Sequence, residues 1–158
     1  SPDPTLNSNA KEQPMSHVLS CFDLSGDGRD LRAFVFVYGT LRQGHSNNNL
    51  LRNDVFFAEA NTVERYTMVD AAGGAFPAVV MEPPTCTIHG DLYAVTDETL
   101  ARLDRLEGTP HHYQRRRVLV ETDEETVFAW IYIQLDVRDR PIVESGDWSR
   151  YLIDTYAT

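Results

Sequence analysis

The segment Tyr38-Gly39-Thr40-Leu41 has the residue types of a ligand-binding turn. It ends a run of β-branched and aromatic residues at 33–38, which is typical of a strand buried on both faces. A glycine just past such a strand lets the backbone approach a ligand closely, and successive peptide N–H groups in a turn can hold a carboxylate. Gly39 could equally serve only a tight turn, so an anion site and a plain turn both stay open.

Glu107 is the second residue whose position suggests chemistry. It stands at the last turn of an expected helix over 97–106, directly before Gly108. A carboxylate is disfavoured at the negative end of a helix dipole, and Leu106 beside it favours a raised pKa. A carboxylate that titrates near neutral pH can accept a proton from an amine, as a general base must. An exposed carboxylate on a solvated helix face is the alternative.

Other catalytic and metal-binding patterns are missing from the sequence. It has no Gly-x-Ser-x-Gly elbow, no His-Glu-x-x-His or Cys-x-x-Cys, and no phosphate-binding glycine loop. Cys86 lies in a Pro-rich stretch without an evident base, far along the chain from Cys21. A stretch starting at Asp23 resembles a calcium loop, but Phe34 stands where a bidentate Glu is required. We therefore expect a turn there, and neither a metal nor an organic cofactor.

The composition indicates one globular domain that does not bind nucleic acid. The chain has 158 residues, 42% of them apolar, which is enough for a sizeable core. Its formal charge is −10, whereas phosphate binding requires clustered cations. No apolar run is long enough to cross a bilayer, and no secretory leader is evident. We expect a cytoplasmic protein with free thiols.

The periodicity of apolar residues indicates many strands and few helices. Strands are expected at 33–38, 55–60, 63–69, 78–81, 88–95, 113–121 and 126–134, a helix at 97–106, and a short helix starting within 46–53. Together they indicate an α+β fold with a mostly antiparallel, curled sheet that could close into a barrel. We expect residues 1–30 to be disordered or an extra N-terminal segment, and residues 31–158 to form the domain.

An ordered series of short segments over roughly residues 34–151 resembles the gamma-glutamyl cyclotransferase-like family. The branch it resembles most is that of the gamma-glutamylamine cyclotransferases. The segments are Val37-Tyr38-Gly39-Thr40-Leu41-Arg42, Phe76-Pro77-Ala78, Gly90-Asp91-Leu92-Tyr93, Leu103-Asp104-Arg105-Leu106-Glu107-Gly108, Tyr113-Gln114-Arg115 and Ser145-Gly146-Asp147-Trp148.

The resemblance implies a compact antiparallel barrel with short helices and a cofactor-independent reaction. The α-amine of a γ-glutamyl substrate attacks its own side-chain amide, which yields 5-oxoproline and a released amine or amino acid. By the same resemblance, the turn at 38–41 holds the substrate carboxylate, Glu107 relays the proton, and Phe76 and Pro77 wall the pocket. Tyr113 and Tyr38 are further candidates, whose hydroxyls could bond Glu107 or the oxyanion unless they are satisfied in the core.

Two other functions remain open at this point. One is an enzyme that removes γ-glutamyl caps from a metabolite by the same cyclisation, and the other is a non-catalytic module that keeps the fold and binds a small molecule. Arg42 could approach the substrate carboxylate or could be an exposed loop residue. The sequence does not name the released amine or the oligomeric state.

Overall fold

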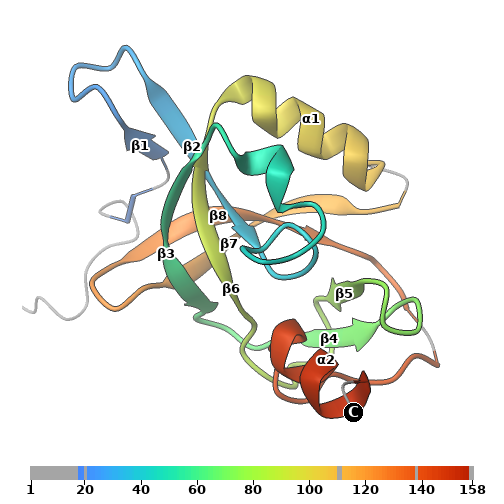
Figure 1. The fold of residues 1–158 in the computed structure, drawn as a ribbon. Coiled ribbons are helices and arrows are strands. Elements are labelled where there is room, and N and C mark those ends of the chain that lie inside the picture. Colours follow the sequence, from blue (N-terminus) through green and yellow to red (C-terminus); the bar gives the residue numbers. More distant parts are fainter. Residues whose placement is uncertain (1–17, 20, 110–111, 138, 157–158) are drawn as a thin grey trace, which may run out of the picture.

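The computed structural model describes residues 18–19, 21–109, 112–137 and 139–156. Within them the chain forms two α-helices, one 3-10 helix and eight strands (Figure 1). In chain order these are β1 (Cys21–Asp23), β2 (Leu31–Val37), the 3-10 helix (Asn48–Leu51), β3 (Val55–Thr62), β4 (Thr67–Asp70), β5 (Pro77–Val80), β6 (His89–Val95), α1 (Asp97–Glu107), β7 (Gln114–Glu121), β8 (Thr126–Ile133) and α2 (Trp148–Tyr156).

Five strands close into a barrel in the order β2-β6-β3-β7-β8, and β8 pairs back with β2. Four of the five pairings are antiparallel, and the closing one, at Val35 and Trp130, is parallel. An odd number of strands cannot alternate in direction around a closed ring, so one parallel pair is unavoidable. The predicted α+β fold, with a mostly antiparallel barrel and a few short helices, is confirmed.

Strand β2 is buried on both faces, as its continuous apolar run predicts. Phe34 and Phe36 pack with residues from the other four barrel strands. Val35 and Val37 point to the opposite face, since side chains alternate along a strand, and they pack against Leu103 of α1. The strand therefore connects the barrel interior to the helix that ends at Glu107.

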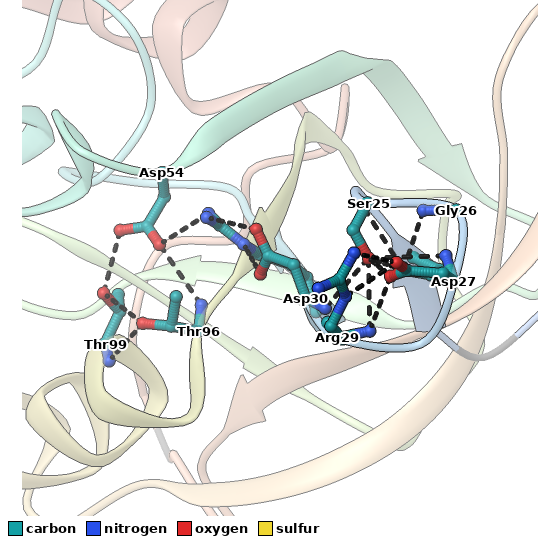
Figure 2. A network of polar contacts seen from close by, with 10 residues as sticks. Ser25, Gly26, Asp27, Arg29, Asp30, Asp54, Thr96 and Thr99 are labelled. Carbon is teal, nitrogen blue, oxygen red and sulfur yellow. Dashed lines mark hydrogen bonds and ion pairs between the residues drawn. The ribbon is translucent and has the colours of Figure 1, made fainter.

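Helix α1 is held at its start by a buried carboxylate. The Thr96 hydroxyl caps the helix by accepting a hydrogen bond from the backbone N–H of Thr99 at 3.1 Å. Asp54 accepts hydrogen bonds from the N–H of Thr96 and the hydroxyl of Thr99, at 3.2 and 2.9 Å (Figure 2). Arg32 lies 3.7 Å from the same carboxylate. These contacts join the first turn of α1 to β2 and to the start of β3.

Helix α2 was not predicted from the sequence. Trp148, Tyr151 and Leu152 have the spacing of one helical face, and Trp148 is only 1% exposed. Neither α1 nor α2, the α-helices of the described ranges, is long and apolar enough to cross a membrane.

The segment before residue 31 contributes a strand to the sheet, because β1 pairs with β2 from Cys21↔Ala33 to Asp23↔Leu31. The loop between them is the expected turn: Asp23 accepts hydrogen bonds from the backbone N–H groups of Ser25, Gly26 and Gly28. Figure 2 shows this loop beside the Asp54 contacts. Residues 1–17 and 20 of the expected N-terminal segment 1–30 lie outside the described residues, and the domain boundary at residue 31 stays a prediction.

Candidate active site

One cavity of about 320 Å³ lies where the end of β2, the β4–β5 loop and the end of α1 meet. Its walls include every residue that the sequence analysis placed at a site, from three distant parts of the chain. These residues are Tyr38, Gly39, Thr40, Leu41, Phe76, Pro77, Glu107 and Tyr113. Their roles in binding or catalysis stay predictions, but the structure brings all of them to one cavity.

The turn after β2 offers backbone donors to this cavity. The turn is held within its own loop, because Arg42 donates its N–H to the Gly39 carbonyl and Asn47, which also lines the cavity, donates to the Thr40 carbonyl and hydroxyl, at 2.8–3.0 Å. The N–H groups of Gly39, Thr40 and Leu41 donate to no other described residue. An unpaired backbone N–H requires a ligand or water as partner, so this turn suits an anion.

Gly39 is required by a close approach to Pro77. A Cβ atom at residue 39 would lie 2.8 Å from both Cγ and Cδ of the Pro77 ring. Gly39 is not among the residues with a positive φ, so its backbone conformation does not itself demand glycine. The glycine therefore brings the turn against the opposite wall of the cavity.

Gly39→Ala is expected to lower the free energy of unfolding by about 1–3 kcal/mol, the usual cost of forcing extra atoms into a packed site. Urea unfolding measures this change. The double variant Gly39→Ala/Pro77→Ala should recover part of the loss, because it removes the ring atoms that the new methyl meets. A Gly-to-Ala change at a position with room for the methyl group usually stabilises a protein. A Gly39→Ala variant that is more stable than the parent would therefore contradict this account.

Glu107 lines the cavity and is partly buried. It lies four residues after Leu103, which is buried against the barrel, so both side chains are on the same helix face. Burial raises the pKa of the Glu107 carboxyl to about 7. The predicted direction is therefore right, and its cause is desolvation. Gly108, in the left-handed conformation with φ 67°, ends α1.

The two candidate tyrosines donate their hydroxyls to backbone carbonyls and not to Glu107. Tyr38 donates to the carbonyl of Tyr132 at 2.7 Å and accepts from the N–H of Val79 at 3.2 Å. Tyr113 donates to the carbonyl of Pro77 at 3.0 Å. Burial, and then nearby negative charge that includes Glu107, raises the pKa of both hydroxyls. In this structure both tyrosines therefore line the cavity and link its backbone segments by hydrogen bonds.

Arg42 is buried, so its interpretation as an exposed loop residue is wrong, and it is not among the residues that line the cavity. It is 8% exposed and lies 3.3 Å from Asp91 and 3.4 Å from Asp147. Asp91 also accepts the N–H of Gln43 at 2.9 Å. The ion pairs thus hold the chain just beyond the 38–41 turn. No local pattern in the sequence pairs an Arg with an Asp so far along the chain.

Sequence reasoning missed Tyr132, which also lines the cavity. Its hydroxyl donates to Asp104 at 2.7 Å, and Arg115 lies 3.0 Å from the same carboxylate. Asp104 precedes Glu107 by one helical turn, so this contact holds the last turn of α1 on the barrel. Tyr132 lies in an alternating strand pattern, which predicts only a core position. No group of three or more potential metal ligands exists among the described residues.

Comparison with known proteins agrees with this architecture. A family model described as "Gamma-glutamyl cyclotransferase, AIG2-like" matches residues 35–150. A Vibrio cholerae protein provisionally named a gamma-glutamylcyclotransferase is 40% identical over 119 residues, which cover 75% of this chain and 96% of that protein. The gamma-glutamylcyclotransferase family protein YtfP of Escherichia coli K12 is 32% identical, covering 72% of this chain and 94% of its own length.

The fold is also shared with a solved structure. The crystal structure of an AIG2-like protein from Mus musculus superposes with a TM-score of 0.67 at 27% identity, covering 73% of this chain and 88% of the mouse chain. The matched segment contains the turn after β2, the β4–β5 loop and Glu107. This chain therefore belongs to the gamma-glutamyl cyclotransferase, AIG2-like family.

Proposed function

We propose that this protein is a cyclotransferase that closes a γ-glutamyl group to 5-oxoproline and releases an amine or amino acid. The observation that carries the proposal is a carboxyl with a pKa of about 7, Glu107, at a cavity that also contains three backbone N–H groups without a partner among the described residues. A proton acceptor that works near neutral pH and an anion-binding turn are the two components that this reaction needs. The family membership and the relatives' names support the same activity.

The turn at 38–41 is suited to the substrate's α-carboxylate. Hydrogen bonds from backbone N–H groups to a carboxylate are charge-assisted and stronger than neutral ones. The N–H groups of Gly39, Thr40 and Leu41 lie together at the cavity and have no partner among the described residues. With the carboxylate bound there, the substrate's α-amine and side-chain amide would share the cavity with Glu107.

Glu107 would move one proton in each half of the reaction. Its carboxylate takes a proton from the α-ammonium, and the freed nitrogen attacks the Cδ carbonyl, which forms a five-membered ring and a tetrahedral oxyanion. The Glu107 carboxyl then gives this proton to the leaving nitrogen as the original amide C–N bond breaks. The ring nitrogen loses its second proton through the same carboxylate to the released amine, so the products are 5-oxoproline and an ammonium ion. Because the attack is intramolecular, holding the substrate folded supplies much of the rate enhancement. Backbone N–H groups or a nearby side chain would stabilise the oxyanion.

The proposal predicts an acid limb in the pH profile. Glu107 must be ionised in the free enzyme to accept the ammonium proton, and its pKa is about 7. We expect kcat/KM to fall about tenfold per pH unit below pH 7 and to level off above it. Initial rates of 5-oxoproline formation between pH 5 and 9 measure this. An acid limb near pH 4.5, the ordinary range of Glu, would show that a different group controls the rate.

The direct test of function is a substrate panel. The full chain is incubated with γ-glutamylamines, γ-glutamyl amino acids and a γ-glutamyl-capped amine, and 5-oxoproline is quantified by mass spectrometry. Release of 5-oxoproline from any class supports the proposal, and the relative rates identify the preferred leaving amine. A blank panel combined with tight binding of a γ-glutamyl ligand by calorimetry would instead indicate a binding module.

A further inference from the structure

Asp70, at the end of β4, is a buried carboxylate that the proposed reaction does not use. It is 1% exposed. One of its oxygens accepts hydrogen bonds from the backbone N–H groups of Gly74 and Ala72, at 2.8 and 3.4 Å. The other accepts the hydroxyls of Tyr151 and Tyr156, each at 2.8 Å. A single carboxylate therefore joins the β4–β5 loop to helix α2.

The loop that Asp70 binds forms one wall of the cavity. The loop ends at Ala75 and Phe76, which line the cavity together with Pro77. Gly73 and Gly74 have φ of 60° and 93°, so the loop contains two residues of high intrinsic flexibility. Phe76 is 40% exposed and is not fixed by packing on all sides. The loop's position therefore depends on its hydrogen bonds, and those from the N–H groups of Ala72 and Gly74 to Asp70 tie it to the end of β4.

Helix α2 presents the two hydroxyls from a rigid support. Trp148 is buried in the hydrophobic core, and the Tyr151 ring stacks on it with 5.3 Å between ring centroids. Tyr156 packs edge-on against Tyr151 at 6.1 Å. The Tyr156 ring also lies against Gly74, where an added Cβ would meet it at 3.0 Å. Both tyrosines follow residue 150, where the match to the family model ends.

We propose that α2 belongs to the active site of this protein through Asp70, Tyr151 and Tyr156, which act as positioning residues for the wall at Ala75, Phe76 and Pro77. The wall contacts bound substrate away from the reacting atoms, so its position affects the ground state and the transition state alike. Such contacts change KM while kcat stays near its original value. This effect on KM rests on the proposed cyclotransferase function, whereas the effect on the loop does not.

The test replaces Tyr156 by Phe in the full chain. This variant keeps the aromatic ring against Gly74, and Asp70 still accepts the hydrogen bond from the Tyr151 hydroxyl. Tyr151→Phe is the second variant and removes the other hydroxyl. Asp154→Asn is the matched control, because it removes the exposed pair with Arg150 on the same helix, at 3.1 Å, and does not involve Asp70. Hydrogen–deuterium exchange of the 71–76 segment and steady-state kinetics are measured on each protein.

Tyr156→Phe is expected to speed exchange at the N–H groups of Ala72 and Gly74 and to raise KM about tenfold with kcat within about twofold, near the low end of the effect of losing one hydrogen bond to a charged group. Asp154→Asn should change neither. Unchanged exchange in 71–76 for both tyrosine variants, or a fall in kcat without a rise in KM, overturns the proposal. If the parent protein releases no 5-oxoproline, the cyclotransferase function fails, and the exchange data alone then decide whether α2 positions the loop.

Discussion

Replacement of Glu107 by Gln is expected to lower kcat for 5-oxoproline release by about 10³-fold, within the range by which a single acid–base group accelerates a reaction. Gln has nearly the same shape and can neither accept the ammonium proton nor return one to the leaving amine. Both halves of the proposed reaction use this carboxylate, so no step bypasses it. The measurement is steady-state release of 5-oxoproline at pH 8, where the parent Glu107 is ionised because its pKa is about 7.

Glu98→Gln is the matched control, since it makes the same change in the exposed first turn of the same helix and should leave kcat unchanged. An unfolded Glu107→Gln variant would also be inactive. Measuring the free energy of unfolding against pH distinguishes this outcome from a loss of catalysis. The folded pKa of Glu107, about 7, exceeds its ordinary value of 4.5, so ionisation costs folding free energy that grows from pH 4.5 to 7. The cost at pH 8 is on the order of 3 kcal/mol.

Glu107→Gln removes this cost and should therefore be at least as stable as the parent protein at pH 8, with the difference shrinking towards pH 4.5. A folded variant that still releases 5-oxoproline at the parent rate would contradict the proposed mechanism.

Asp91→Ala is expected to lower the free energy of unfolding by about 3–5 kcal/mol, the range for removing one partner of a buried ion pair. Asp91 is 2% exposed and lies 3.3 Å from Arg42, which is itself buried. The variant would leave this guanidinium with Asp147 at 3.4 Å, a carboxylate whose side chain is 31% exposed. It would also leave the N–H of Gln43 without its acceptor. Urea unfolding at pH 7 measures the loss.

Asp123→Ala is the control for this change, because Asp123 is exposed in the turn between β7 and β8; a surface substitution of this kind usually changes stability by less than about 0.5 kcal/mol. If Asp91→Ala costs no more than Asp123→Ala, the ion pairs of Arg42 contribute little to the fold. Because Arg42 directly follows the 38–41 turn, Asp91→Ala should also raise KM in the protein that remains folded.

Local patterns were sufficient to predict most elements of the barrel. The continuous apolar run of β2, the Leu spacing of α1 and the acidic turn between β7 and β8 each follow from interactions between residues close in sequence. The fold was also indicated by the ordered series of segments that resembles the family, since periodicity alone does not determine how strands pair.

Features that join distant parts of the chain were not predictable in this way. Arg42 was misjudged because its partners, Asp91 and Asp147, are brought to it only by the β2–β6 pairing and by the approach of α2. Tyr132 was missed because the alternating pattern of a strand is the same for a tyrosine that lines a cavity and for a tyrosine in the core. Asp70 was missed because its hydrogen-bond donors lie in the β4–β5 loop and in helix α2, and the sequence analysis did not predict that helix.

The sequence by itself determined which residues had suitable chemistry: the turn at 38–41 and a carboxylate at Glu107. The tertiary structure decided that they meet, since α1 packs through Leu103 on the outer face of β2 and brings Glu107 to the cavity where that strand ends. It also decided that Glu107 titrates near neutral pH, because a raised pKa here comes from burial. Burial is a property of the assembled barrel, helix and loop, and no single segment of the chain contains it.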